Sequence, residues 1–401
     1  MTRSPGRGAA IVGTGFSDAA RHSSASLGAH VVQACLRAIE DCGLSVADID
    51  GVANYPNPSR PVGAIVDGVD VAGVNYVAAT LGLSNLGWAC SISQGTMVGA
   101  LVEAINAVLA GAARHVLVWR GMFNPPGRFG RVEVTTAEAG NQFTHPYGLV
   151  HNVMVFALPY ARYLWKYGKT RADLAAFVSK NRDLVVDDPD AVFAGRPLSV
   201  DDYLRARMIA TPLSLYDCDM PVTGCGALVV SAADRAGDLR QRPAYVAGHV
   251  SLGLPGHNSP IMQYEHLAES GRRLGAKLWE NAGLRPSDVD QANLYDGFSY
   301  YVPFWAEWLG FCGEGEGLDY LASDAADRVP INTNGGALGR GRLHGTPQVI
   351  EAVRQLQGRA FHQVEGARVT VAQAGDPSHG AAAVVLTRDL VPRFGMGERW
   401  T

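Results

Sequence analysis

Residues 38–55, AIEDCGLSVADIDGVANY, return 240 positions later as residues 278–295, LWENAGLRPSDVDQANLY. The match runs without a gap from residues 27–55 to residues 267–295. Identical pairs include Glu40/Glu280, Gly43/Gly283, Leu44/Leu284, Asp48/Asp288, Asp50/Asp290 and Tyr55/Tyr295. Each copy predicts a helix that ends at the glycine, then a short acidic turn and a strand. A chain that repeats such a unit is expected to contain two similar halves.

Apolar segments outside this repeat also occur in pairs. Each half opens on one, AAIVGTG at residues 9–15 and AYVAGHV at residues 244–250. Each half closes on another, GCGALVVS at residues 224–231 and HGAAAVVL at residues 379–386. Fully apolar strands that alternate with helices predict an α/β protein whose sheets are covered on both faces.

The two predicted halves meet near residue 240 and differ in length. We expect an N-terminal half over residues 1–240 and a C-terminal half over residues 241–401. The first is longer because of an insert over about residues 121–216, which begins with a Pro/Gly-rich segment and continues as amphipathic helices. Inserts of this size between the strands of an α/β half usually form a lid or a wall of the substrate site.

The composition excludes several classes of protein. The 401 residues are 47% hydrophobic and 18% charged with a formal net charge of −4, which is typical of a packed globule and not of a nucleic-acid-binding protein. The six cysteines form no C-x-x-C pair, a usage typical of reduced thiols in a cytoplasm. No apolar run approaches the roughly 18 residues of a membrane span, and the histidines lack a metal-ligand spacing. We therefore expect a soluble cytoplasmic protein without a bound metal.

A glycine-rich loop with one histidine precedes a predicted helix near the C-terminus. Residues 331–345 read INTNGGALGRGRLHG and contain five glycines and His344. Glycines permit positive φ angles and let a ligand or a second backbone come close. A histidine held just before a helix N-terminus is a candidate reaction centre. The alternative is a tight loop whose histidine has no function.

Three motifs, taken in this order and spacing, identify a family. They are LYDGFSYY at residues 294–301, WLGFCGEGEG at residues 308–317 and NTNGGALGRGRLHG at residues 332–345. Together with the duplicated halves, they resemble the thiolase superfamily, in its sterol-carrier and lipid-transfer-protein branch. The resemblance covers nearly the whole chain. It implies the thiolase fold, with two βαβ-rich halves in an αβαβα layered core and an inserted lid or loop domain.

Both cysteines that a thiolase uses for acyl transfer are missing. The nucleophile is expected at the start of the helix that ends at Gly111, where this chain has Gln94. The second cysteine is expected in the loop before the last strand, where this chain has Ala374. Cys90 lies four residues before Gln94, and we expect it to be a buried wall residue and not a displaced nucleophile.

Two other positions of the thiolase site remain polar. The resemblance implies that Tyr295 replaces an asparagine that holds water near the thioester, and that His344 is the histidine of the family's loop. A site without sulfur that has a phenol and an imidazole implies a retro-aldolase, which cleaves a β-hydroxyacyl-CoA, in some members one with a sterol side chain, into a ketone and a shorter acyl-CoA. Tyr295 would then take the β-hydroxyl proton while His344 holds the thioester oxygen. The partition of acid and base roles stays open, and His379 is a candidate substitute.

The other candidates are for substrate binding: Gln94, Asp296, Gly336, Arg342 and Thr346. Thr346 stands where members of the branch carry a second tyrosine. Asp296 follows Tyr295 in an expected strand, and the alternation of a strand would turn it away from Tyr295 and favour a structural role.

Two alternative functions compete with the retro-aldolase. One is a thiolase-type acyltransferase that recruits Cys90, and the other is a non-catalytic subunit that binds acyl-CoA. The retained His344 and the acquired Tyr295 favour the retro-aldolase. The resemblance also implies that coenzyme A enters as part of the substrate, with no tightly bound cofactor. It further implies a homodimer and a small OB-fold/zinc-ribbon partner protein, which together would give a heterotetramer.

Overall fold

The core of the molecule is built on one mixed β-sheet. The computed structural model describes residues 8–56, 65–93, 95–124, 136–137, 139–252, 263–378 and 380–390. Within these ranges the sheet has nine strands in the order β3-β2-β4-β7-β1-β8-β11-β10-β9. The strands are β1 (Ala9–Phe16), β2 (Gly51–Asn54), β3 (Trp88–Ser91), β4 (His115–Met122), β7 (Gly224–Ala232), β8 (Ala244–Leu252), β9 (Gln291–Asn293), β10 (Val369–Ala374) and β11 (Ala381–Thr387).

The sheet has a seam between β1 and β8. These two strands share only the residue pairs Ala10↔Tyr245 and Ile11↔Ala244, whereas β1 pairs with β7, and β8 with β11, along most of their lengths. Two half-sheets, β3-β2-β4-β7-β1 and β8-β11-β10-β9, lie on either side of the seam. Helices α3 (Thr96–Ala110) and α13 (Thr346–Gln357) contact strands of both half-sheets and therefore form a middle layer.

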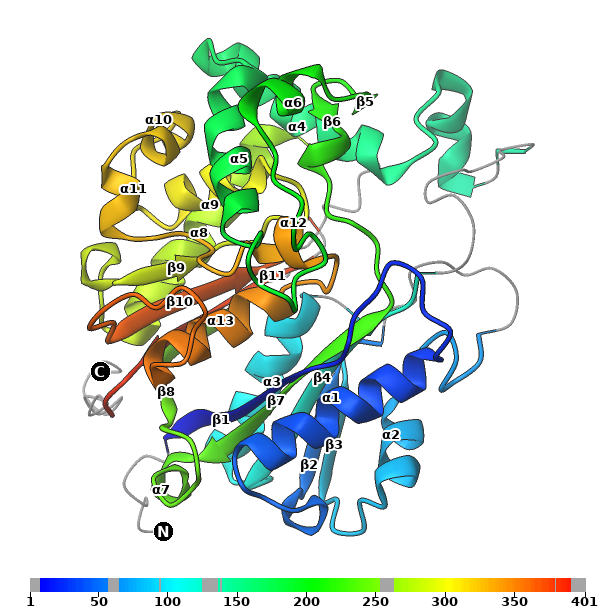
Figure 1. Ribbon diagram of the computed structural model, residues 1–401, viewed down its shortest axis with the longest axis vertical. Helices are drawn as coiled ribbons and strands as arrows, with labels where there is room; N and C mark the ends of the chain where they lie inside the picture. Colours follow the sequence, from blue (N-terminus) through cyan, green and yellow to red (C-terminus); the bar gives the residue numbers. More distant parts are fainter. Residues whose placement is uncertain are drawn as a thin grey trace, which may run out of the picture.

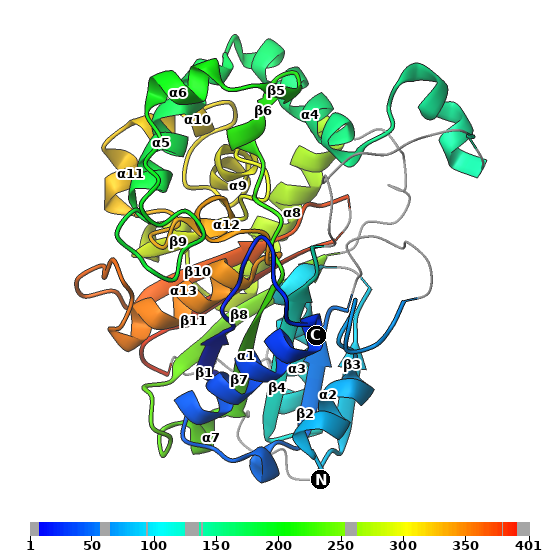
Figure 2. The same ribbon diagram turned by 45° about the vertical axis from the view of Figure 1, so that its right-hand side comes forward.

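Outer helices cover the other face of each half-sheet. Helix α1 (Leu27–Asp41), with α2 (Val74–Leu81) beside it, lies along β1, β7 and β4 (Figure 1). Helix α8 (Tyr264–Ala282) packs on β8 and β11, with α9 (Tyr301–Trp308) against it (Figure 2). Helix α3 is buried on nearly all sides because it has a sheet on both faces, and its sequence is correspondingly apolar. These five layers confirm the fold expected from the sequence.

The sequence repeat is a structural repeat. Helices α1 and α8, the short 3-10 helices η1 (Val46–Asp48) and η6 (Pro286–Asp288), and strands β2 and β9 follow one another in the same order in both halves. Tyr55 follows β2 directly, and Tyr295 follows β9 after one intervening residue, so both lie just beyond the corresponding strand as the repeat predicts.

The duplicated aspartates hold the same position in each half. A carboxylate oxygen of Asp50 accepts a hydrogen bond from the backbone N–H of His115 (2.8 Å), at the start of β4. A carboxylate oxygen of Asp290 accepts one from the N–H of Val369 (2.9 Å), at the start of β10. Each aspartate thus links the start of its own strand to the start of the neighbouring parallel strand.

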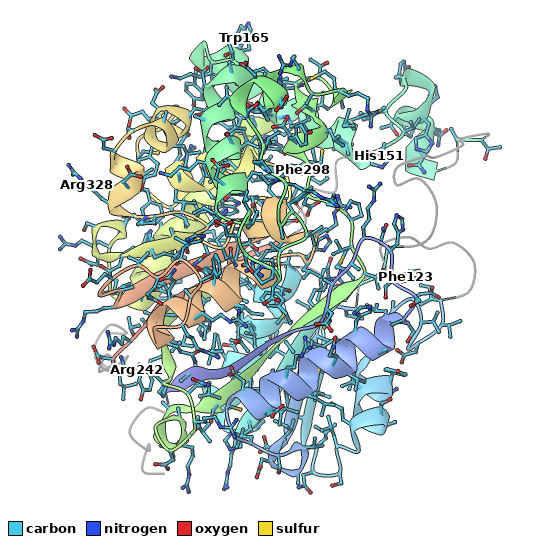
Figure 3. All side chains as sticks on the ribbon, in the orientation of Figure 1. Phe123, His151, Trp165, Arg242, Phe298 and Arg328 are labelled. Atoms are coloured by element: carbon cyan, nitrogen blue, oxygen red, sulfur yellow. The ribbon has the colours of Figure 1, made fainter. Side chains whose placement is uncertain are left out.

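The insert packs on the C-terminal half through some of its helices. Its elements are η2 (Ala139–Phe143), η3 (His145–Tyr147), α4 (Asn152–Tyr167), η4 (Arg171–Leu174), α5 (Ala175–Asp183), α6 (Val200–Arg205), β5 (Met208–Ala210), β6 (Leu213–Ser214) and η5 (Leu215–Asp217). On α4, Tyr160 stacks on Tyr300 and Tyr163 packs against Phe304, so this aromatic face belongs to the core. Figure 3 shows Phe298 inside this part of the molecule and Trp165 at its outer end. The division of the chain at residue 240 stays a prediction.

The remaining helices are α7 (Ala233–Ala236), α10 (Gly317–Ala322), α11 (Ala325–Arg328) and α12 (Gly336–Arg340). No helix in the described part of the chain is long and apolar enough to cross a membrane. The same residues contain no group of three or more His, Cys, Asp or Glu side chains that could hold a metal ion.

Candidate active site

Tyr295 lies in the loop after β9 with its ring partly exposed. Its backbone N–H donates to Oε1 of Gln373 in β10 (3.2 Å), and its ring centroid lies 6.1 Å from that of Tyr301. The phenol rests on Gly297, where a Cβ would lie only 2.5 Å from Tyr295 Cζ. Since β9 ends at Asn293, Tyr295 and its successor are not in a strand as the sequence suggested. The loop carries the phenol over a residue that has no side chain.

Burial, together with a nearby negative charge, makes the phenol of Tyr295 a weak acid. Burial raises the pKa of Tyr295 well above 10, and the negative charge of Asp219 raises it further, while Arg342 opposes both. Tyr295 is therefore protonated at neutral pH. A phenolate base, which the sequence-based mechanism would use, needs another group to take its proton.

His344 ends the glycine-rich loop and precedes Gly345, the N-cap of α13. Its backbone has a φ of 44°, in the left-handed region, and its carbonyl oxygen accepts the N–H of Met97 at the start of α3 (3.1 Å). This conformation is rare for a residue with a side chain and marks functional sites. Burial, followed by the positive charges of Arg120 and Arg342, holds the pKa of His344 well below 6.5. The histidine is thus neutral at physiological pH.

The end of β10 connects the two candidate residues. Gln373 binds the backbone of Tyr295, and the next residue, Ala374, packs against Gly345, where a Cβ would collide with the Ala374 methyl group. The loop of Tyr295 and the loop of His344 therefore meet at one strand end, beside the N-termini of α3 and α13. Ala374, which the resemblance aligns with the second thiolase cysteine, is fully buried there.

None of the six cysteines is activated. Burial is the main cause that raises the pKa of every thiol: Cys35, Cys42, Cys90, Cys218, Cys225 and Cys312. Cys90 lies in β3, at the edge of the sheet, and is partly exposed, not a fully buried wall residue. A nucleophilic cysteine needs a lowered pKa, so Cys90 is a poor substitute for the missing thiolate.

Asp296 is enclosed beneath the glycine-rich loop. Its carboxylate accepts the backbone N–H groups of Ala337 (2.7 Å) and Leu338 (3.1 Å) and the side-chain N–H of Gln348 (2.6 Å). Burial raises its pKa to about 7, against the effect of these hydrogen bonds. A side chain at Gly336 would collide with this carboxylate, so the glycine is required by the packing. These contacts support a structural role for both residues, and their contact with substrate stays a prediction.

Arg342 is held by a residue that the sequence did not single out. Its Nε donates to Oδ1 of Asp219 (2.6 Å), and its backbone N–H donates to the carbonyl of Met220. The backbone N–H of Asp219 donates to the carbonyl of Gly297 (3.2 Å), beside the phenol of Tyr295. Oδ2 of Asp219 is buried and accepts no hydrogen bond from the described residues. The structure therefore adds Asp219 to the candidate site.

The remaining candidates are Thr346, Gln94 and His379. The side chain of Thr346 is fully buried against Gly226 of β7, and its hydroxyl donates to the carbonyl of Leu343 (2.7 Å), so substrate contact would require this packing to open. Gln94 and His379 lie outside the described residues.

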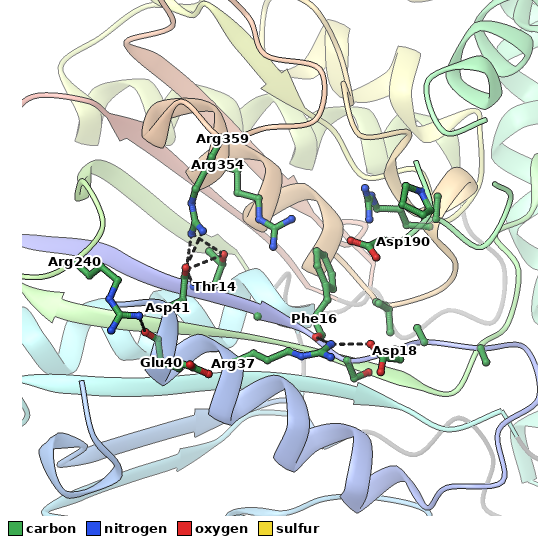
Figure 4. Close-up of a pocket in the computed structure, with 18 residues that line it drawn as sticks. Thr14, Phe16, Asp18, Arg37, Glu40, Asp41, Asp190, Arg240, Arg354 and Arg359 are labelled. Atoms are coloured by element: carbon green, nitrogen blue, oxygen red, sulfur yellow. Dashed lines mark hydrogen bonds and ion pairs between the residues drawn. The ribbon is translucent and has the colours of Figure 1, made fainter. Parts of the chain in front are cut away.

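A cavity of about 810 Å³ lies on the other side of the glycine-rich loop. Figure 4 shows Arg37, Glu40 and Asp41 of α1 on one side of it, and Arg354 of α13 and Arg359 just after that helix on the other. Asp41 pairs with Arg359 across it. Neither Tyr295 nor His344 lines this cavity, so we do not assign the reaction to it.

Known proteins are similar to this chain in sequence and fold. Residues 257–388 match the family model described as thiolase C-terminal domain-like. The chain is 33% identical over 383 residues to 17-hydroxy-3-oxo-4-pregnene-20-carboxyl-CoA lyase of Mycobacterium tuberculosis, covering 92% of this chain and 96% of the relative. It is 31% identical over 373 residues to the steroid side-chain-cleaving aldolase of Thermomonospora curvata, covering 88% of this chain and 92% of the relative.

A solved structure leads to the same conclusion. The Ltp2-ChsH2(DUF35) aldolase superposes with a TM-score of 0.83 at 28% identity, covering 95% of this chain and 97% of that one. The chain belongs to the thiolase superfamily, in the sterol-carrier and lipid-transfer-protein branch that includes aldolases. The family and the lyase class expected from the sequence are confirmed.

Proposed function

We propose that this protein is a CoA-dependent retro-aldolase that cleaves a β-hydroxyacyl-CoA into a ketone and a shorter acyl-CoA. One observation carries the proposal: the loops of Tyr295 and His344 meet at the end of β10, where the side chain present is that of Ala374. Alanine cannot form an acyl-enzyme, and the raised pKa values of the cysteines leave no ready thiolate elsewhere. Chemistry at this strand end therefore depends on a phenol, an imidazole and a carboxylate.

The relatives suggest the acyl group. The Mycobacterium tuberculosis relative is named for a pregnene carboxyl-CoA, and the Thermomonospora curvata relative for the cleavage of steroid side chains. We infer that the substrate here is a bulky β-hydroxyacyl-CoA of steroid type. Coenzyme A enters as part of that substrate, and no tightly bound cofactor is needed for the reaction.

The reaction moves one proton and one electron pair before product release. The β-hydroxyl group loses its proton, the bond between Cα and Cβ breaks, and its electron pair becomes the enolate of the shorter thioester. The former hydroxyl carbon leaves as the ketone, and protonation at Cα completes the acyl-CoA. The site must therefore supply a base at the hydroxyl group and hydrogen-bond donors at the thioester oxygen.

In this proposal, Tyr295 and Asp219 act on the β-hydroxyl group of the substrate. Tyr295 orients the β-hydroxyl group by a hydrogen bond, but its own raised pKa keeps it protonated. Asp219 lies behind Gly297 and has a carboxylate oxygen without a hydrogen bond from the described residues, so we assign it as the proton acceptor. This modifies the sequence-based expectation that Tyr295 acts as the base by itself.

In this proposal, His344 contacts the thioester oxygen of the substrate. A neutral imidazole can donate one hydrogen bond to the oxygen on which charge accumulates. The adjacent cations Arg120 and Arg342 favour negative charge in this region, as enolate formation requires. His379 remains the substitute acid or base.

The assembly is proposed from the resemblance and from one structural relative. The Ltp2-ChsH2(DUF35) aldolase is named as a complex of two proteins. We propose that this chain forms a homodimer and binds a small OB-fold/zinc-ribbon protein, giving a heterotetramer in the cytoplasm.

The decisive experiment offers a panel of 3-hydroxyacyl-CoA thioesters, including steroid-type ones, to the chain purified with its partner protein. Mass spectrometry should detect a ketone and an acyl-CoA shortened by that ketone. Tyr295→Phe keeps the ring and removes the hydroxyl group, and it should lower kcat by about 10²–10⁴-fold. Asp219→Asn keeps the acceptor for Arg342 and should be similarly slow.

The same experiment separates the alternatives. With a 3-oxoacyl-CoA and free coenzyme A added to the panel, thiolytic cleavage through an acyl adduct on Cys90 would establish the acyltransferase instead. Tight binding of acyl-CoA without turnover of any panel member would establish the non-catalytic subunit.

A further inference from the structure

Arg120 is a buried arginine at the end of β4, only 1% exposed. One guanidinium nitrogen, Nη1, donates to the carbonyl oxygen of Tyr55 (2.7 Å), and the guanidinium carbon lies 4.6 Å from the centre of the Tyr55 ring. The other, Nη2, contacts Sδ of Met122 (2.6 Å). These contacts come from two neighbouring strand ends, β2 and β4, and they fix the plane of the guanidinium group.

The fixed guanidinium group contacts the candidate reaction centre. Nη2 of Arg120 lies 3.3 Å from Nδ1 of His344, and the ring centroids of Tyr55 and His344 are 6.4 Å apart. Arg120 and His344 are 224 residues apart in the chain, so this contact is a product of the fold. Because the carbonyl of His344 also accepts the N–H of Met97, both the backbone and the ring of the histidine are held.

The hydrogen-bonding capacity of Arg120 determines which nitrogen of the His344 ring carries the proton. A guanidinium group has donors and no acceptor. Nδ1 of His344 must therefore offer its lone pair to Arg120, which leaves Nε2 as the nitrogen that carries the proton in a neutral ring. A doubly protonated ring would set an N–H against a guanidinium N–H and add a positive charge beside two others, Arg120 on β4 and Arg342 in the loop. Among the described residues, Tyr55 at the end of β2 is a further titratable group next to the ring.

We propose that Arg120 is a positioning residue that fixes His344 as the neutral tautomer with its proton on Nε2, so that His344 acts as a hydrogen-bond donor and not as a base. The role of His344 as a donor in the reaction rests on the proposed function, whereas the inferred tautomer of its ring does not. Burial lowers the pKa of Arg120 to about 10, so the guanidinium group still keeps its charge at neutral pH. His344 therefore stays neutral as the pH falls through the range in which histidines usually titrate.

The first test measures the ring directly in the complete chain. Protein labelled with ¹⁵N at histidine is followed by long-range ¹H–¹⁵N NMR from about pH 5.5 to about pH 8.5, a range around the ordinary histidine pKa, with His344→Gln to assign the signal. We expect a protonated Nε2 and an unprotonated Nδ1 throughout. A proton on Nδ1, or titration of His344 near pH 6.5, would overturn the proposal.

The second test removes the guanidinium group. Arg120→Met keeps an unbranched side chain and removes the donor to Nδ1, so part of the His344 rings should carry their proton on Nδ1 in the NMR spectrum. The pKa of His344 should rise but stay below its ordinary value, because burial and the charge of Arg342 remain. We expect kcat to fall by about 10- to 100-fold with little change in KM, because the donor loses its alignment. Arg120→Lys keeps a positively charged donor, so it should favour the unprotonated Nδ1 again while restoring only part of the rate.

Controls separate this effect from simple destabilisation. Arg114→Met makes the same change at an exposed arginine just before the start of β4 and should leave the pH profile unchanged. If Arg120→Met folds but His344 keeps the wild-type NMR pattern and pH profile, Arg120 has no positioning role. If the wild-type ring is locked as expected but no β-hydroxyacyl-CoA is cleaved, the proposed function fails while the inference about Arg120 stands.

Discussion

Gly297→Ala should damage the site through one methyl group. A Cβ at residue 297 would lie 2.5 Å from Cζ of Tyr295 and 2.9 Å from its Cε1, and closer still to the hydroxyl oxygen. Since ordinary contacts begin near 3.4 Å, the phenol has to move by about 1 Å. A displacement of that size at a reacting group costs about 10²-fold in rate, equivalent to about 2.7 kcal/mol in activation free energy. We therefore expect kcat to fall by about 10²-fold.

The fold should survive this change. Gly297 is not among the residues with positive φ, so alanine is compatible with its backbone. The ring of Tyr295 is only partly buried and can swing away from the new methyl group. We expect the thermal midpoint to change by a few degrees at most, about 1 kcal/mol or less in stability. The loss of activity should therefore appear without unfolding.

The assay is steady-state release of ketone from the 3-hydroxyacyl-CoA that the wild type cleaves. Gly237→Ala is the matched control, because a Cβ there meets nothing within 4 Å and its φ is −68°. Combining Gly297→Ala with Tyr295→Phe should be no slower than Tyr295→Phe alone, since both act on one hydroxyl group. If Gly297→Ala turned over at the wild-type rate with its phenol visibly displaced, the role assigned to Tyr295 would be wrong.

Three further predictions concern other parts of the site. Asp296→Ala leaves two backbone N–H groups and a glutamine side chain without their buried acceptor, so chemical denaturation should show a loss of about 3–5 kcal/mol; a loss below about 1 kcal/mol would contradict the structural role. Incubation with acyl-CoA should give no acyl-enzyme by intact-protein mass spectrometry, and Cys90→Ser should keep full activity. Because the pKa of His344 is lowered in the folded state, the unfolded chain binds a proton that the folded chain refuses, and the free energy of unfolding should decline as pH falls below about 6.5. Urea titrations at several pH values should show a smaller decline for His344→Gln, and an unchanged slope would count against a lowered pKa.

Local signals in the sequence were enough to predict much of the fold. The apolar runs became strands β1, β7, β8 and β11. Gly111 and Gly283, expected to end helices, have left-handed backbones directly after α3 and α8. Such features depend on the residues within one turn or one strand, and they can be read without knowing the fold. The position of His344 before a helix belongs to the same class.

Partners that are distant in the chain could not be predicted. Arg120 looks like one charged residue at the end of an apolar strand, and Asp219 like part of a loop at the end of the insert. Their contacts with His344 and Arg342 span 224 and 123 residues, and only the packing of the two halves creates them. The expectation for Asp296 used strand alternation, but β9 stops at Asn293. Its burial comes from helix α12 closing over it.

The narrow seam between β1 and β8 bears on how such a chain could have arisen. Two residue pairs contribute little to joining the half-sheets, whereas α3 from one half and α13 from the other each cover both. A single, unduplicated half would have one helix to cover the inner face of its sheet and would leave much of that apolar face in water. It would gain a complete interior only by pairing with a second copy. The ancestor of this fold is therefore expected to have been a symmetric homodimer, and duplication and fusion of its gene freed each half to lose or acquire catalytic side chains independently.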